Sequence, residues 1–362
     1  MIRVDDDFIF DCHLDLAMNA IEWNRDLKQT VADIRKREEG MVDKPDRGKG
    51  TVAFPELRKG NVGVVVATQI ARYVRPGSEL PGWNSPEIAW AITQAQLEWY
   101  SAMEKQGELR QITNLKELQD HLAQWTDSSG GKRKTIGYIL SLEGADSIVD
   151  LSYLEKAYAY GLRACGPAHY GPGRYAPGTG TSGPLTKEGR ELVKEMDRLH
   201  MILDVTHLTD EGFEEALSIF KGPVWASHHN CRTLVQHQRQ LTDDQIKVLI
   251  SRDAVIGGVL DTWMLTNNWI RGKDDPEERG VNLEKLIDHF DHICQLAGNS
   301  LHIAIGSDLD GAYGKEQSPY DLEDISDLQN LKTLLTNRGY SRDDVSNIFH
   351  GNWLRFLQKA WK

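Results

Sequence analysis

The sequence predicts an α/β protein with a (β/α)8 barrel (TIM barrel) fold, and two observations support this class. Eight short apolar segments rich in β-branched residues alternate with longer segments of helical periodicity along the 362 residues. Most of the short segments are apolar throughout, as expected of parallel strands that are covered on both faces. We therefore expect a single barrel domain over residues 1–362 that ends in short helices at about residues 341–361.

The expected strands include two long β-branched segments, "VGVVVATQ" and "TIGYILSLE", and six shorter ones. In chain order the eight strands cover residues 8–12, 62–69, 135–143, 162–169, 201–207, 223–228, 254–261 and 301–308.

The expected helices lie between and after these strands, and the one at "SPEIAW" has the clearest start. Ser85 can cap it, and Pro86 suits the first turn. The helices cover residues 86–106, 114–125, 151–160, 187–199, 210–219, 242–251, 281–297 and 322–336. Two loops rich in glycine and charge, 36–50 and 171–184, each follow the carboxyl end of a strand, where barrel enzymes build their active sites.

Composition excludes several classes of partner. The formal net charge of -12 argues against binding to nucleic acid or to an anionic membrane surface. No segment approaches the roughly 20 apolar residues that cross a bilayer, and little chain precedes the first candidate ligand. Four scattered cysteines, with no CxxC pair, suit reduced thiols. We expect a cytoplasmic protein with no signal peptide. The cysteines are Cys12, Cys165, Cys231 and Cys294.

The first strand ends in "DCHLD", which places His13 and Asp15 two residues apart. Side chains at this spacing point to the same side of a sheet, so both could reach one metal ion. On its own the pair favours a packed histidine and a helix-capping aspartate. The ends of the other strands decide between the two interpretations.

Titratable side chains stand at the carboxyl ends of six of the eight expected strands, and in a barrel these ends share one rim. They are His13 with Asp15, Glu143, His169, His207, His228 and Asp308. So many such residues on one rim indicate a metal site.

The candidate ligands outnumber those that one catalytic Zn²⁺ needs. They are His13, Asp15, Glu143, His207 and His228. These five suffice for two ions if Glu143, on the central strand, bridges them, and two ions can hold a hydroxide between them and polarise a carbonyl. His228 is chosen over His229 because it has the strand-end position. The remaining histidines are interpreted as structural.

The chain resembles the membrane (renal) dipeptidase family, metallopeptidase family M19, among the amidohydrolase-like barrels. The matching stretches span almost the whole chain in the family's order. They are "DCHLDL", "LEGAD", "PAHY", "DVTH", "PVWASHHNCRTL", "RQLTDDQI", "IAIGSDLDG" and "GNWLRFL".

The resemblance implies roles for individual residues. His13, Asp15 and Glu143 would hold one zinc ion, and Glu143, His207 and His228 the other. Catalysis and substrate binding would involve three further side chains beside Glu143. His169 would lie over the substrate carbonyl, Arg239 would bind the C-terminal carboxylate, and Asp308 would meet the amino group and handle protons.

The implied activity is that of a binuclear zinc dipeptidase that hydrolyses small dipeptides, with a D-residue accepted at the C-terminal position. The alternative is a binuclear amidohydrolase that acts on N-acyl amino acids, lactams or lactones. Arg239 favours the first, because a free carboxylate requires a bidentate cation. A barrel that has lost its chemistry is disfavoured because every ligand position is filled.

Several details stay open at this point. Mn²⁺ or Co²⁺ could occupy the same ligands in place of Zn²⁺. The resemblance suggests a homodimer. The chain has "SHHN" and "PAH" where relatives have "SHSS" and "LTH", and these departures bear on substrate size and stereochemistry.

Overall fold

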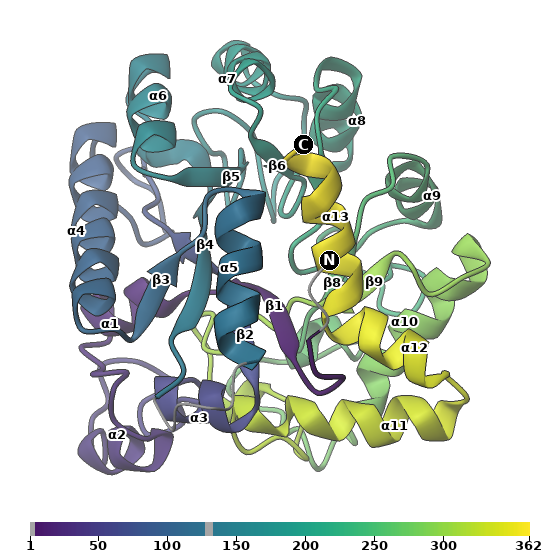
Figure 1. Ribbon diagram of the computed structural model, residues 1–362. Helices are drawn as coiled ribbons and strands as arrows, with labels where there is room; N and C mark the ends of the chain where they lie inside the picture. The colour runs from purple at the N-terminus through teal and green to yellow at the C-terminus, as the bar shows by residue number, and fades with distance from the viewer. Residues whose placement is uncertain (1–3, 127–132) are drawn as a thin grey trace.

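The computed structural model describes residues 4–126 and 133–362, with helices arranged around a curled parallel sheet (Figure 1). Six strands pair in the order β1-β2-β4-β5-β6-β7, and β8 pairs with β9. Their bounds are β1 Ile9–Leu14, β2 Val62–Gln69, β4 Ile136–Glu143, β5 Leu162–Gly166, β6 Ile202–Asp204, β7 Val224–Trp225, β8 Ile256–Gly258 and β9 Ile303–Ile305. The predicted α/β barrel class is confirmed, and each predicted strand segment contains or overlaps one of these strands.

Two contacts link the strand pair β8-β9 to the larger sheet. Ala226, just after β7, forms a parallel bridge with Ile256 of β8. On the other side, the backbone N–H of Asp308 donates to the carbonyl of His13 at 3.3 Å. The strands therefore form a ring in which the last strand lies beside the first.

One strand, β3 (Leu109–Gln111), was not predicted. It pairs with the first residues of β4, Ile136–Tyr138, along the edge that β5 occupies further on. Its three residues, "LRQ", are too few and too polar to show a strand pattern.

Each of the eight helix segments predicted between and after the strands contains or overlaps a helix. Ser85 caps α4 as expected, with its hydroxyl accepting from the N–H of Ile88 at 3.2 Å. The predicted helices are α4 Pro86–Lys105, α5 Leu115–Thr126, α6 Leu151–Ala159, α7 Lys187–Arg198, α8 Asp210–Ile219, α9 Asp243–Ser251, α10 Glu284–Ala297 and α11 Asn330–Arg338. In the last predicted segment a 3-10 helix, Ile325–Gln329, precedes α11.

Three helices of six or seven residues lie in the first sixty residues and were missed, because two turns are too few for a clear helical period. They are α1 Leu16–Glu22, α2 Val31–Arg37 and α3 Phe54–Lys59. The helix α2 overlaps the start of the predicted loop 36–50. In residues 4–126 and 133–362, none of the helices is both long and apolar enough to cross a membrane.

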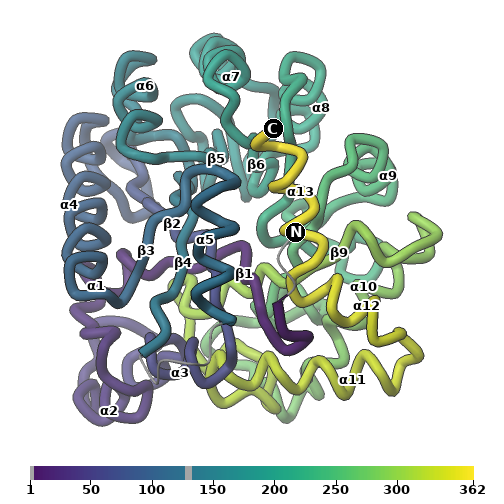
Figure 2. The backbone as a smooth tube through the Cα atoms, in the orientation of Figure 1, coloured from purple at the N-terminus to yellow at the C-terminus, as the bar shows by residue number. Residues whose placement is uncertain are grey.

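The chain ends in two helices, α12 (Arg342–Ser346) and α13 (Asn352–Ala360), and α13 lies close to the N-terminal segment (Figures 1 and 2). The ring of Trp353 packs against Phe10 of β1 and Trp225 of β7. Its indole N–H donates to the carbonyl of Ile305 in β9 at 2.9 Å. The last helix thus holds together strands from both ends of the chain.

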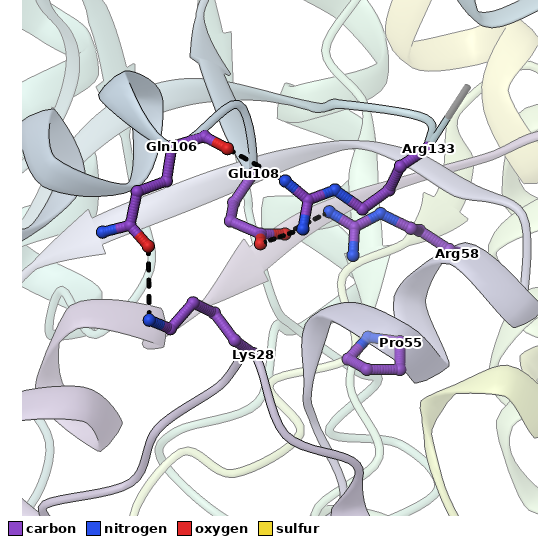
Figure 3. A pocket seen from close by; sticks show the side chains of 6 residues that line it. All are labelled: Lys28, Pro55, Arg58, Gln106, Glu108 and Arg133. Carbon is purple, nitrogen blue, oxygen red and sulfur yellow. Dashed lines mark hydrogen bonds and ion pairs between the residues drawn. The ribbon is translucent and has the colours of Figure 1, made fainter.

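A hollow beside the start of β3 is lined by Lys28, Arg58, Glu108 and Arg133, among others (Figure 3). Both arginines donate to the carboxylate of Glu108. Arg58, Glu108 and Arg133 lie shortly before β2, β3 and β4 respectively, whereas the predicted site lies at the opposite, carboxyl ends of the strands. The ion pairs at this hollow are therefore interpreted as part of the fold.

A buried ion-pair network joins the loop after β1 to the loop after β9. The guanidinium of Arg25 contacts Glu38 at 2.8 Å, Asp46 at 3.0 Å and Asp310 at 3.5 Å. Asp310 also accepts from the backbone N–H of Thr51 at 2.7 Å. Because all these charges are paired and hydrogen-bonded, the network fixes the two loops relative to each other.

Replacing Asp310 by alanine is expected to destabilise the protein by about 3 kcal/mol or more, because Arg25 loses one partner and backbone N–H groups become unsatisfied. Urea denaturation measures this change. The control is Lys116→Ala, which removes an exposed pair with Asp120 and should cost no more than about 0.5 kcal/mol. Equal stability of the two variants would show that the network does not hold the loops.

Candidate metal centre

Glu143, the last residue of β4, lies at the centre of the cluster of strand-end side chains. Its Oε2 is 3.5 Å from Nε2 of His13. Its Oε1 is 3.1 Å from Nε2 of His207 and 3.5 Å from Nε2 of His228. The two carboxylate oxygens therefore face different histidines, as is required of a carboxylate shared by two cations.

The structure brings together all five of the predicted metal ligands, and Asp308 joins them. Within each of three overlapping groups, the potential ligand atoms lie within 4.8 Å of one another. The groups are His13 with Asp15 and Glu143, Glu143 with His207 and His228, and His13 with His228 and Asp308.

His13 shows that this cluster favours a cation. Its buried Nε2 has no hydrogen-bond partner among residues 4–126 and 133–362. Burial alone would lower the pKa of His13, but the carboxylates of Glu143, Asp15 and Asp308 outweigh it and raise that pKa to about 10. A divalent cation on the Nε2 lone pair would satisfy both the orphaned atom and the surrounding carboxylates, and imidazole and carboxylate are suitable ligands.

The pKa of Asp15 also indicates that the cluster favours a cation. Burial and the nearby Glu143 carboxylate raise the pKa of Asp15 to about 7, against the opposing effects of His13 and Thr68. The Thr68 hydroxyl in β2 donates to Asp15. A bound cation would restore the ionised form of such a carboxylate.

Hydroxyl groups orient the two histidines on the other side of Glu143. Thr179 Oγ1 lies 2.8 Å from Nδ1 of His207, and Ser227 Oγ lies 2.9 Å from Nδ1 of His228. Burial lowers the pKa of both histidines well below the usual range, so both imidazoles are neutral. A hydroxyl can accept from Nδ1–H, and the Nε2 lone pair is then free to face the centre, in the form that binds a metal.

Asp11 fixes the end of the first strand by hydrogen bonds to its carboxylate. Its carboxylate accepts from the backbone N–H of Ser307 at 2.9 Å and from that of His13 at 3.2 Å. This contact positions the His13 strand end against the loop after β9. In that loop Asp308 has a φ of 57°. His207, which follows β6, has a φ of 69°. Both are in the left-handed conformation that few residues other than glycine adopt.

His169 lies three residues after β5 and faces the same centre. Its Nε2 is 3.9 Å from Oε1 of Glu143, and its Nδ1 is 2.8 Å from a guanidinium nitrogen of Arg72. Burial lowers the pKa of His169 to about 3, with Arg72 adding to this effect and Glu143 opposing it. The ring is therefore neutral.

Arg239 lies in the loop after β7 and is buried. It donates to the carbonyl of His228 at 2.9 Å, and its Nη1 lies 3.2 Å from the ring nitrogens of His229. In the described part of the chain it forms no ion pair with a carboxylate, and its Nε has no partner. A buried guanidinium of this kind has donors left for an anionic ligand.

The two strands for which no functional residue was predicted also contribute charged groups, one partly buried and one buried. Arg72 follows β2 by three residues. Asp261 follows β8 and accepts from Trp263 at 2.6 Å and from Gln317 at 2.8 Å; burial raises the pKa of Asp261 to about 7. Asp261 could have been found, because it ends the predicted strand 254–261. Arg72 gave no such signal, since it lies in a loop.

The profile of the membrane dipeptidase family, peptidase family M19, matches residues 4–362. The chain belongs to this family. It is classed with the family's metallo-dipeptidases, and the match covers all of the strand ends described above. The resemblance inferred from the strand-end residues is thereby confirmed.

Individual proteins agree with this membership. Dipeptidase verJ of Clonostachys rogersoniana is 32% identical over 232 residues, which is 62% of this chain and 56% of that protein. The matched region also spans only 54% and 52% of two other fungal dipeptidases, so this chain matches about half the length of these relatives.

Two solved structures share the fold. A bacterial-type family M19 metallopeptidase, dipeptidase AC, superposes with a TM-score of 0.79 at 23% identity over 98% of both chains. A metallopeptidase from Rhodobacter sphaeroides, solved with a phosphinate mimic of the dipeptide L-Ala-D-Ala, superposes with a TM-score of 0.78 at 22% identity. It covers 98% of this chain and 99% of its own.

Thr179→Val is expected to weaken metal binding about 10- to 100-fold, because His207 loses the hydroxyl that orients its ring. Competition with a chelator of known affinity measures the change. The matched control is Thr181→Val in the same loop, whose hydroxyl bonds to the carbonyl of Gly178. Unchanged affinity in Thr179→Val would mean that the hydroxyl does not support the ligand.

Proposed function

We propose that the protein is a binuclear zinc dipeptidase and that Glu143 bridges the two ions. The observation that carries this proposal is the division of the Glu143 carboxylate between two sets of side chains. His13 and Asp15 stand on one side, and His207 and His228 stand on the other. Family membership supports the reaction class, since its members cleave a dipeptide bond with metal assistance.

The substrate would be held at both charged ends. Arg239, a buried guanidinium without a carboxylate partner in the described residues, would bind the C-terminal carboxylate. Asp308, 3.7 Å from Nε2 of His13, would bind the ammonium group beside the metals. If both contacts form, only a substrate with one peptide bond between its charges would fit, because a further residue adds about 3.5 Å of chain. The complex of the Rhodobacter sphaeroides relative supports acceptance of a D-residue at the C-terminal position.

The two ions would supply a nucleophile from water at neutral pH and polarise the scissile carbonyl. His169, a neutral imidazole facing Glu143, would donate to the carbonyl oxygen as negative charge develops there. Burial raises the pKa of Asp308 well above its usual range, with Asp15 and Glu143 adding to this effect and His13 opposing it. Bound cations would restore the ionised form of Asp308. The carboxylate could then accept a proton from the attacking water and return it to the leaving amine.

The purified protein is expected to contain two metal ions per chain, and Glu143→Gln is expected to lose both metal and several orders of magnitude in kcat. A neutral amide is a poor bridge between two dications. Elemental analysis and kcat after Zn²⁺ addition measure this. Glu56→Gln, at another buried glutamate, is the control and should keep both properties. Full activity with one ion, or with none, would contradict the proposal.

Arg239→Ala is expected to lower kcat/KM for free dipeptides about 10- to 200-fold, the value of one sheltered charge-assisted contact. The same variant should differ little from the wild type on a C-terminally amidated dipeptide. Metal content is measured alongside, because Arg239 also bonds to the His228 carbonyl.

The matched control for this prediction is Arg232→Ala, an arginine of the same loop that already pairs with Asp210. It should affect both substrates equally. Equal losses for Arg239→Ala on free and amidated dipeptides would remove Arg239 from carboxylate binding, and preference for an N-acyl amino acid or a lactone would favour the alternative amidohydrolase.

A further inference from the structure

We propose that Arg72 is a positioning residue that makes His169 a hydrogen-bond donor towards the reacting carbonyl and keeps it from becoming a metal ligand. The inference deepens the proposed function, since it assigns a determinant to the role of His169. Arg72 lies beyond the end of β2 and is not among the predicted site residues.

The first step is the direction of the hydrogen bond between the two side chains. A guanidinium nitrogen of Arg72 lies 2.8 Å from Nδ1 of His169. Arginine has only N–H donors and no acceptor, so Nδ1 must offer its lone pair. A proton on Nδ1 would place two N–H groups against each other. The ring proton of His169 is therefore on Nε2, the nitrogen that faces Glu143 at 3.9 Å.

The second step is the contrast with the neighbouring histidines. Nδ1 of His207 and of His228 is bonded to a hydroxyl, that of Thr179 and Ser227 respectively. A hydroxyl can accept from Nδ1–H, which leaves Nε2 with a lone pair for a metal. The partner behind each ring thus limits its chemistry. A hydroxyl allows the ligand form of His207 and His228, whereas the guanidinium of Arg72 allows only the donor form of His169, although all three rings face Glu143.

The third step is the rigidity of Arg72 itself. Its second guanidinium nitrogen donates to the carbonyl of Pro81 at 2.8 Å. Its backbone carbonyl accepts from the N–H of Trp83 at 2.8 Å, and the N–H of Val74 donates to the carbonyl of Trp83 at 2.9 Å. These bonds form a parallel bridge between Tyr73 and Trp83 and close residues 72–83 into a loop. Hydrogen bonds to both the backbone and the guanidinium of Arg72 thus hold its side chain against His169.

The decisive test reads the His169 tautomer in the zinc-loaded enzyme without substrate. Nitrogen-15 NMR separates a protonated ring nitrogen from one with a free lone pair, and His169→Gln assigns the signals. In the wild type we expect a protonated Nε2 and a lone pair at Nδ1. A metal-bound Nε2 or a protonated Nδ1 would overturn the proposal. This result does not depend on which substrate the enzyme cleaves.

The kinetic test uses Arg72→Met, which keeps much of the side-chain volume and removes the donors. We expect kcat to fall about 10- to 100-fold with bound metal unchanged, a part of the 10²- to 10³-fold cost of losing one oxyanion donor. Arg72→Lys, which can only donate, should restore most of the loss. Arg75→Met, at an exposed arginine of the same loop, is the matched control and should match the wild type.

A double-mutant cycle separates positioning from general support of the fold. Arg72→Met should add little to the loss in His169→Ala, because there is no ring left to orient. Losses that multiply in the double variant, or a failure of Arg72→Lys to recover activity while its metal content is normal, would contradict the role of Arg72. An inactive wild-type enzyme with the expected tautomer would instead contradict the proposed function.

Discussion

Carboxylates that are buried together repel one another, and Asp15, Glu143 and Asp308 all lie around the single imidazole of His13. In the described part of the chain no arginine or lysine forms an ion pair with any of the three. The nearby guanidinium groups, Arg72 and Arg239, bond to histidines instead. Three carboxylates thus lie around one imidazole, so negative charge exceeds positive charge at this point, and this excess is what a divalent cation would bind. The supporting hydroxyls and backbone contacts are arranged around that point.

This arrangement depends on loops that are held as firmly as the strands. The short strands β6 to β9 have only two or three residues each, so the site residues after them are positioned mainly by the loops. Hydrogen bonds with the hydroxyls of Thr179 and Ser227 fix two of the ligand rings, and bonds to the carboxylate of Asp11 fix the first strand end. The ion pairs of Arg25 with Glu38 and Asp310 fix the loop after β1 relative to the loop after β9. A site that acts by positioning requires such support.

Sequence reasoning reached the barrel and the cluster of strand-end residues because both follow from local rules. A buried parallel strand is apolar throughout, and its carboxyl end faces the common rim, so Glu143 and His207 could be placed without coordinates. Arg72 could not, because its partner His169 is 97 residues away and the loop of residues 72–83 has no periodic pattern. The short helices α1 to α3 and the strand β3 were missed because two turns, or three residues, carry too little periodicity. The hydroxyl partner of His207, Thr179, could not be predicted either, because it lies in a loop far along the chain from that histidine.

The hydrogen bond between Asp11 and Ser307 joins residues 296 positions apart, and it has a consequence for the order in which the molecule matures. A nascent chain that has emerged as far as His228 already contains His13, Glu143 and His207. Its first strand end still lacks the support that Ser307 provides, and barrel closure awaits β9. Contacts of such sequence separation form late, because a long loop must close first. The complete geometry for a metal ion would therefore exist only after synthesis of nearly the whole polypeptide, and a truncated chain would present the ligands without that geometry.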